Sequence, residues 1–115
     1  MTASPYTVLS LFTGAGGLDL GFDLEGFENF EGVEINRTLK HNRPTWNIYE
    51  GDVRYYEPQL SQQPDVLLAG FPCQGFSLGG NRDENDSRNT LYRDVIRVAY
   101  TIKPRVIVIE NVLNL

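Results

Sequence analysis

Short apolar runs alternate with amphipathic stretches along most of the chain. Residues 7–12 (TVLSLF) are apolar and rich in β-favouring side chains, and shorter runs of this kind occupy 30–34 (FEGVE) and 46–50 (WNIYE). The run at 66–70 (VLLAG) is unbroken, as expected of a strand covered on both faces, and 105–109 (RVIVI) is again continuous in apolar residues. The pattern predicts five strands.

Three helices are expected between these strands, at residues 18–25, 36–42 and 91–102. Asn36 suits the N-cap of the second helix, and Pro44 ends that helix because a proline restricts the backbone before it. In the first helix apolar side chains are available for packing, and in the third they recur at helical spacing. These side chains are Leu18, Phe22, Leu24, Leu91, Val95, Val98 and Ile102.

The alternation of strands and helices predicts an α/β fold, a mostly parallel sheet with helices on both faces. Residues 79–89 (GGNRDENDSRN) interrupt it with a polar segment that holds no large apolar side chain, which is typical of a surface loop. Only a few residues follow the fifth strand, so we expect residues 106–109 at or near an open edge of the sheet. The chain is then expected to be a piece of a larger protein or one subunit of a split one.

Composition narrows the classes of partner. The 115 residues, 13.0 kDa, suffice for one domain or part of one. Because 10 Lys and Arg face 15 Asp and Glu, a strongly basic nucleic-acid-binding surface is absent, and the positive field for such a partner has to come from elsewhere. The single cysteine, Cys73, excludes an internal disulfide and suits a reducing compartment. No signal peptide or membrane-spanning run is expected.

A glycine-rich turn joins the first strand to the first helix. Glycines let the backbone turn tightly and approach a ligand closely, and the start of a helix offers free N–H groups. The spacing departs from the strict dinucleotide pattern G-x-G-x-x-G, which weakens the case for a pyrophosphate ligand, and a turn without any ligand is the alternative. The candidate ligand-binding residues are Phe12, Thr13, Gly14, Ala15, Gly16, Gly17 and Leu18.

Acidic residues follow the second and third strands. Glu34 stands about 20 positions after the glycine turn, where a carboxylate holds a ribose through its hydroxyl groups. Asp52 could accept a hydrogen bond from an adenine amino group, with Ile35 and Val53 on either side of the ring. Taken singly, Glu34 is a solvated strand-end charge and Asp52 an ordinary turn residue. Together with the glycine turn they predict an adenosine site at one edge of the sheet.

Two further motifs follow the fourth and fifth strands. In residues 70–77 (GFPCQGFS), Cys73 lies behind a proline and between glycines, so a rigid turn displays its side chain on the ligand side. A cysteine placed in this way is a candidate nucleophile, although a lone cysteine is usually a small buried apolar residue. Glu110, in Glu110-Asn111-Val112, ends the fifth strand at the same edge and can hand a proton to a ring nitrogen. A strand-end carboxylate facing water is the alternative.

The full set of motifs resembles the DNA (cytosine-5) methyltransferase family. FTGAGG is similar to its S-adenosylmethionine-binding motif, GFPCQGFS to its catalytic Pro-Cys motif, and ENV to its catalytic Glu motif. DSRNTLY, residues 86–92, resembles the motif that follows the mobile loop of the family. The order matches, and the match covers nearly the whole chain. The resemblance implies a Rossmann-like S-adenosylmethionine-dependent methyltransferase fold, of which this chain holds the first five strands.

The resemblance also implies catalytic roles. Cys73 would attack C6 of a cytosine flipped out of the duplex, and Glu110 would hold and protonate N3. C5 of the ring would then take the methyl group, and loss of the C5 proton and elimination of Cys73 would release 5-methylcytosine. Asn111 would brace the Pro-Cys turn, and Pro72 would line both cofactor and base.

The implied cofactor is S-adenosylmethionine, and no metal is expected. Glu34 would take the ribose and Asp52 the adenine amine, while the cofactor would be packed by Phe12, Ile35, Val53 and Leu91. The implied partner is double-stranded DNA with a flipped cytosine, over which residues 79–89 would close. The candidate DNA contacts are Gln74, Ser77 and Arg88.

The chain departs from the family in three respects. Asn89 stands where glycine is common, at a small cost because Asn tolerates left-handed geometry. Residues 82–88 carry more acidic than basic side chains, which is poor for gripping phosphate. The later motifs, the target-recognition region and the C-terminal helix of the family have no counterpart. Residues 1–115 are therefore expected to form the N-terminal part of the catalytic domain, to be inactive or weakly active alone, and to need the missing C-terminal half or a complementary subunit.

The leading hypothesis is methylation of cytosine C5 in DNA by a restriction–modification enzyme, in the bacterial cytoplasm near the nucleoid and without a membrane partner. Two alternatives stay open. The substrate could be cytosine in a tRNA, because nothing in these residues separates DNA from RNA. The chain could also be a non-catalytic subunit that binds a nucleotide or a partner protein, although the intact Cys73 and Glu110 argue against that.

Overall fold

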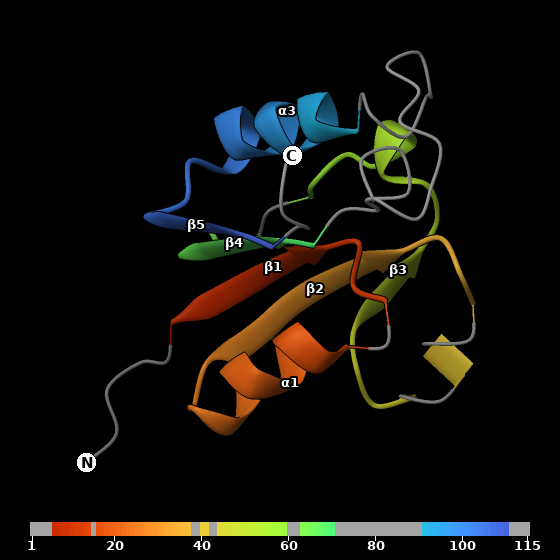
Figure 1. The fold of residues 1–115 in the computed structure, drawn as a ribbon, viewed down its shortest axis with the longest axis vertical. Coiled ribbons are helices and arrows are strands. Elements are labelled where there is room, and N and C mark those ends of the chain that lie inside the picture. Colours follow the sequence, from red (N-terminus) through yellow and green to blue (C-terminus); the bar gives the residue numbers. More distant parts are fainter. Residues whose placement is uncertain are drawn as a thin grey trace, which may run out of the picture.

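The computed structural model contains one parallel sheet with a helix on each face (Figure 1). The structure describes residues 6–14, 16–37, 40–41, 44–59, 63–70 and 91–110. The strands are β1 (Thr7–Leu11), β2 (Glu28–Glu34), β3 (Ile48–Glu50), β4 (Val66–Ala69) and β5 (Val106–Ile109). Helices α1 (Gly17–Leu24) and α3 (Tyr92–Ile102) cover opposite faces, and a short 3₁₀ turn, η1 (Val53–Tyr55), follows β3. The predicted α/β fold is confirmed.

The strand order reverses next to β1. The sheet runs β3-β2-β1-β4-β5, so the chain steps from β1 to β2 on one side and later returns to place β4 on the other. At the carboxyl end of β1, Leu11 lies beside Val33 of β2 and Ala69 of β4. Open α/β sheets bind ligands in the crevice outside the strand ends at such a reversal. The topology therefore selects the carboxyl ends of β1 and β4 as the place to look for a site.

Alternating side chains of the central strands build two cores. Leu9 and Leu11 of β1 belong to the larger core, to which α3 contributes Val95, Val98 and Ile102. Val8 of β1 belongs to the smaller core on the face of α1, with Val66 and Leu68 of β4 and the rings of Phe22 and Phe27 at its margin. The period of two along a strand produces this division, because successive side chains point to opposite faces. The unbroken apolar run of β4 is buried throughout, as predicted.

The two helices differ in how well their packing was predicted. In α3 the expected side chains are all buried, together with Leu91 just before it. In α1 the prediction for Leu24 is wrong, because its side chain is 75% exposed. The residue of α1 buried against the sheet is Asp19, and Leu24 follows it by five positions, which at 3.6 residues per turn places it on nearly the opposite side of the helix.

The strand at the far edge is β5. Its pairing with β4 leaves its other side without a strand among the described residues, and Val106 and Ile109 are 52% and 54% exposed. The predicted open edge is confirmed. Elsewhere the strand bounds shift, since β2 begins at Glu28 and β3 at Ile48.

Part of the expected second helix and all of the polar loop lie outside the described residues. Lys40 and His41 are helical, and the His41 N–H donates to the carbonyl of Arg37 at 3.1 Å, as expected within a helix there. Residues 79–89 are not described, and no helix in the part of the chain that is described is long and apolar enough to cross a membrane.

Candidate functional site

A cavity of about 390 Å³ lies at the carboxyl ends of β1, β4 and β5. It is lined by Ser10, Leu11, Phe12, Thr13, Leu18, Asp19, Gly70 and Glu110. The volume falls within the range of small-molecule sites, and the position is the strand-order reversal at which α/β sheets bind ligands. The cavity joins the predicted glycine turn to the predicted acid of the fifth strand, two features far apart in the sequence.

The glycine turn is held in a tight left-handed path. Phe12, Gly14 and Gly16 have positive φ angles of 56°, 61° and 85°, and Gly16 precedes the first turn of α1. The Gly16 N–H donates to the carbonyl of Thr13 at 2.9 Å, which closes the turn. A Cβ built on Gly17 would meet none of the described atoms within 4 Å, so no described side chain packs against Gly17 on that side. This geometry fits the predicted ligand-binding turn, of which only Ala15 is not described.

Glu34 is tied to the glycine turn rather than left free in water. Its Oε1 accepts the N–H of Gly14 at 2.8 Å, and its Oε2 accepts the N–H of Asn36 at 2.8 Å. A carboxylate has about four acceptor positions, so two remain for vicinal hydroxyl groups of a ribose. Ile35, next along the chain, is 67% exposed and can pack on a ligand.

Asp52 caps the turn that follows β3. Its Oδ1 accepts the N–H of Arg54 at 2.9 Å, and both carboxylate oxygens also accept from the Arg54 guanidinium. Hydrogen bonding from Arg54 holds the pKa of Asp52 below its ordinary value, so the side chain is ionised and can accept a hydrogen bond at neutral pH. The structural pairing with Arg54 is a partner that sequence reasoning missed.

Val53 and Leu91 lie in the core of the α3 face. Both are buried, and Phe12 packs against the same core from its margin. Arg97 of α3 donates to the carbonyls of Val53 at 2.8 Å and Tyr56 at 2.9 Å, which fixes the segment that carries Asp52 and Val53. Neither Val53 nor Leu91 lines the 390 Å³ cavity. Their packing on a cofactor therefore stays a prediction.

Glu110 follows β5 at the rim of the cavity. Its N–H donates to the carbonyl of Ala69 at 3.0 Å, which continues the pairing of β5 with β4 by one residue. Its Oε2 lies 3.5 Å from where a Cβ of Gly70 would stand. Gly70 is the first residue of GFPCQGFS, so the carboxylate lies beside the start of the cysteine segment.

The other predicted catalytic and DNA-contacting residues lie outside the described part of the chain. They are Pro72, Cys73, Gln74, Ser77, Arg88 and Asn111. Their roles stay predictions. Among the residues that are described, no cluster of acidic, histidine or cysteine side chains could hold a metal ion.

Two polar residues of the cavity were missed by sequence reasoning. Ser10, inside the apolar strand β1, donates its hydroxyl to Oδ1 of Asp19 at 2.8 Å, and the Thr13 hydroxyl lies 3.3 Å from that of Ser10. Asp19 is 1% exposed, and its burial raises the pKa of its carboxyl. A serine in an otherwise apolar strand, followed by an acid in the first helical turn, is the signal that could have pointed to this pair.

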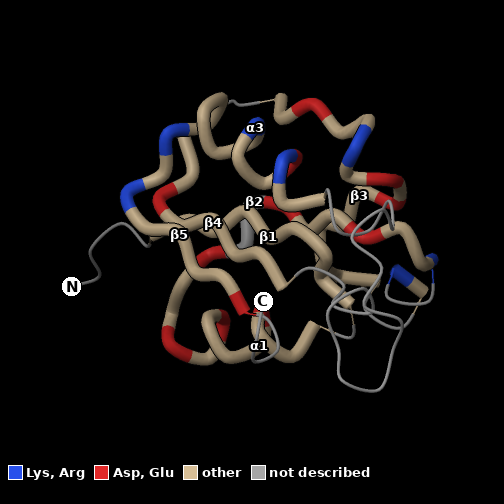
Figure 2. Tube along the Cα trace, turned by 45° about the horizontal axis from the view of Figure 1, so that its top comes forward, with Lys and Arg blue, Asp and Glu red and all other residues tan. Residues whose placement is uncertain are grey.

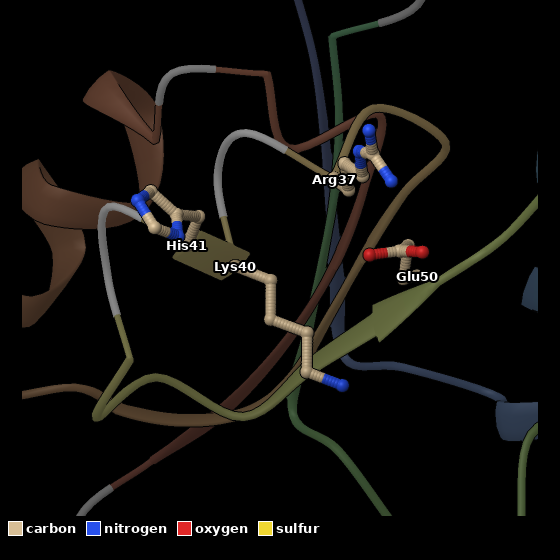
Figure 3. A pocket seen from close by; sticks show the side chains of 4 residues that line it. All are labelled: Arg37, Lys40, His41 and Glu50. Atoms are coloured by element: carbon tan, nitrogen blue, oxygen red, sulfur yellow. The ribbon is translucent and has the colours of Figure 1, made fainter.

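A second cavity of about 550 Å³ lies beside the ends of β2 and β3 (Figure 3). It is lined by Arg37, Lys40, His41 and Glu50, all of them exposed. The His41 ring and the Lys40 ammonium point in different directions from the guanidinium of Arg37 (Figure 3). Because the side chains do not converge, the arrangement lacks the polar geometry of a specific site.

Comparisons with known proteins agree on one family. A family model described as C-5 cytosine-specific DNA methylase matches residues 6–115. The Type II methyltransferase M.Eco47II of Escherichia coli is 43% identical over 116 residues, which cover 96% of this chain and 28% of that protein. This chain spans 28–36% of the length of M.Eco47II and of two further curated Type II methyltransferases that it matches.

Solved structures resemble the fold. A protein described as a DNA modification methyltransferase encoded within a prophage of E. coli matches with a TM-score of 0.75 and 32% identity, over 93% of this chain and 32% of that one. A SAM-dependent methyltransferase from Archaeoglobus fulgidus matches with a TM-score of 0.57 over 89% of this chain and 41% of that one. The second likeness, at 17% identity, concerns the fold alone.

Proposed function

We propose a function on the premise that this chain belongs to the C-5 cytosine-specific DNA methylase family. Its parallel sheet has the Rossmann-like fold of SAM-dependent methyltransferases, as the sequence predicted. We propose that residues 1–115 form the N-terminal part of the catalytic domain. The whole protein transfers a methyl group from S-adenosylmethionine to C5 of cytosine in DNA, as part of a restriction–modification system.

One observation carries the proposal. Glu110 lines the same cavity as Phe12 and Thr13, the first residues of the glycine turn, and its carboxylate lies beside Gly70. Three residues of extended chain span at most about 11 Å, so Cys73 is tethered within that distance of Gly70. A sulfur and a carboxyl can therefore face one pyrimidine at the mouth of a nucleotide-sized cavity.

The residues present fit S-adenosylmethionine. The start of α1 offers N–H groups to a carboxylate. Glu34 and Asp52 do not line the 390 Å³ cavity but follow the neighbouring strands β2 and β3, where Glu34 keeps acceptor positions for a ribose and Asp52 is an ionised acceptor for an adenine amine. Phe12 and Leu18 supply apolar wall, and Ile35 is exposed for packing. The bound cofactor supplies a methyl group activated by a sulfonium.

In the proposed reaction, residues of this chain form the covalent bond to the base and move its protons. The thiolate of Cys73 forms a bond to C6, and Glu110 protonates N3, so the electron pair reaches C5 rather than remaining as charge on the ring. C5 would take the methyl group from the sulfonium, whose carbon–sulfur bond would break to leave a neutral thioether. A base then removes the C5 proton, the S–C6 bond breaks to return the Cys73 thiolate, and N3 gives its proton back to Glu110. Pro72 and Asn111 position the cysteine turn in this scheme.

The substrate is double-stranded DNA with its cytosine flipped out of the stack, contacted by Gln74, Ser77 and Arg88. The net charge of −5 does not attract phosphate, so the remaining part of the protein, or a complementary subunit, supplies the basic surface. The exposed edge of β5, with Val106 and Ile109, fits pairing with a further strand of that part. The protein acts in the bacterial cytoplasm, where its DNA lies.

Covalent trapping tests the proposal. DNA containing 5-fluorocytosine should form a stable adduct with the chain completed by its C-terminal part, because the fluorine cannot leave C5 as a proton does. The adduct is measured as a denaturation-resistant shift on a gel. Cys73→Ser should abolish it, and Glu110→Gln should slow its formation by about 10²- to 10⁴-fold.

Matched controls separate the alternatives. Unfluorinated DNA should give no stable adduct, and a tRNA containing 5-fluorocytidine should give none either. An adduct with the RNA alone would move the substrate from DNA to RNA. Absence of any adduct, or an adduct that persists in Cys73→Ser, would contradict the proposed chemistry.

A further inference from the structure

Asp19 is a buried carboxylate that the proposed chemistry does not use. It lies in the first turn of α1, against β1, and is 1% exposed. Its Oδ1 accepts the hydroxyl of Ser10 at 2.8 Å. Its Oδ2 is also buried and has no hydrogen-bond partner among the described residues. Buried polar atoms are nearly always paired, so an unpartnered carboxylate oxygen in a folded protein calls for an explanation.

The surroundings of this oxygen favour a positive partner. Asp19 lines the 390 Å³ cavity together with Glu110, and no Lys or Arg is among the residues that line it. No Lys or Arg precedes Arg37 in the sequence, so α1 and β1 hold no cation that could pair with Asp19. Burial raises the pKa of Asp19, since the charged form has lost its hydration. A bound cation would offset that loss.

The start of α1, by contrast, favours a negatively charged group. The N–H groups of the first helical turn have no helical carbonyl to bond, and they favour an anion. No described side chain lies within 4 Å of where a Cβ of Gly17 would stand. A carboxylate at the helix start and a cation at Asp19 are the two charges of one α-amino acid group.

We propose that Asp19 binds the α-ammonium group of the amino-acid end of the cofactor, while the start of α1 binds its carboxylate. This inference rests on the proposed function, because it assumes that S-adenosylmethionine occupies the cavity. Ser10 is the positioning residue, since its hydroxyl holds Oδ1 and leaves Oδ2 for the ligand. Asp19 therefore selects for the intact amino acid and not for the adenosine part.

The test pairs one substitution with one missing ligand group. The probes are S-adenosylhomocysteine and 5′-deoxy-5′-(3-carboxypropylthio)adenosine, which differ only by the amino group. Dissociation constants are measured by calorimetry for the chain completed by its C-terminal part, as wild type, as Asp19→Asn and as a control, Asp23→Asn, which changes an exposed acid of the same helix. Circular dichroism and a thermal melt check that each variant is folded.

We expect Asp19→Asn to weaken binding of S-adenosylhomocysteine by roughly 10- to 100-fold, the range for a hydrogen bond to a charged group. Binding of the probe without the amino group should be unchanged, and Asp23→Asn should change neither constant by more than about twofold. Equal weakening of both probes, or of neither, would overturn the inference while leaving the proposed function intact. Failure of the wild-type protein, completed by its C-terminal part, to bind S-adenosylhomocysteine at all would overturn both.

A second variant covers loss of folding. If Asp19→Asn does not fold, Asp19→Ser replaces it, because a serine fits the space and tolerates the first turn of a helix. The same selective loss for the amino-containing probe is expected. An unselective loss in a folded Asp19→Ser variant would count against the ammonium partner.

Discussion

The two faces of the sheet differ in the side chains that they bury and in their charge. On the face of α3 the buried side chains are apolar from β2 to the end of the helix, and the core is continuous. On the face of α1 the apolar core is small, and Ser10 and Asp19 are buried beside it. The charge differs as well: the charged residues within α1 are both acidic, Asp19 and Asp23, whereas α3 carries Arg93 and Arg97 with one acid, Asp94 (Figure 2).

This contrast separates stability from function. The α3 face holds the larger apolar core, and among its described residues no buried side-chain nitrogen or oxygen lacks a hydrogen-bond partner, so it supplies most of the free energy of folding. The α1 face keeps the carboxylate of Asp19 out of water next to the cavity, which lowers stability and, in the role proposed above, prepares a ligand-binding group. Proteins commonly break local packing rules at functional sites in this way. Substitutions on the two faces should therefore have different consequences.

The largest effect is expected from the core under α3. Ile102 is fully buried, and Ile102→Ala leaves a cavity that the neighbouring side chains cannot fill. The free energy of unfolding, measured with urea, should fall by about 2–5 kcal/mol. A loss below about 1 kcal/mol would mean that this face does not dominate stability.

Removing the guanidinium of Arg97 should have the next largest effect. Arg97→Met keeps the apolar stem but leaves the carbonyls of Val53 and Tyr56 without their donor. The free energy of unfolding should fall by about 2 kcal/mol, and cofactor binding should weaken because the segment with Asp52 loosens. Arg93→Met, on the exposed side of the same helix, should change neither quantity.

On the α1 face, Asp19→Asn should change how stability depends on pH. Burial raises the pKa of Asp19 in the folded state above its unfolded value of about 3.9. The folded protein therefore holds this proton more tightly, and stability is lost as pH rises from below 4 through the folded pKa. Asn has no such proton.

The measurement is a series of thermal melts between pH 3.5 and 7, a window of about 3.5 units. The melting temperature of Asp19→Asn relative to wild type should rise across it. This rise in relative melting temperature should correspond to a smaller change in stability than the loss caused by Arg97→Met, because the Ser10 hydroxyl offsets part of the cost of burying Asp19. A relative melting temperature that falls with rising pH would show that the ionised carboxylate stabilises the folded state.

The smallest effect is expected at Leu24, also on α1. Its side chain is 75% exposed, so Leu24→Ala removes little buried area. Alanine also favours helices, and the free energy of unfolding should change by less than about 0.5 kcal/mol. A loss above about 1 kcal/mol would indicate that α1 buries a wider face than the sheet contact alone.

Much of the fold could be predicted because hydrophobic periodicity is a local property. The spacing of Val95, Val98 and Ile102 specified the inner face of α3, and the apolar run of β4 specified a strand covered on both sides. Leu24 was misjudged because apolar character alone does not fix the angle of a short helix against the sheet. The glycine turn was recognised since backbone geometry there depends on residue type.

The site was predicted less completely because its contacts join distant residues. The motifs placed Glu34, Asp52 and Glu110 at strand ends, which parallel strands bring to one edge of the sheet. Amino-acid order could not reveal that Glu34 binds Gly14, that Asp52 pairs with Arg54, or that Asp19 is buried.

Residue order therefore specified the strands, the helices and the edge at which the chemistry gathers, since each follows from side-chain type and short-range spacing. Packing in three dimensions alone decided which charges lose water and which atoms find partners. Ser10 contacts Asp19 only after α1 has packed against β1, and Glu110 contacts Gly70 only after β5 has paired with β4. Desolvation and hydrogen bonding of these groups depend on such tertiary contacts, so they arise only in the folded molecule.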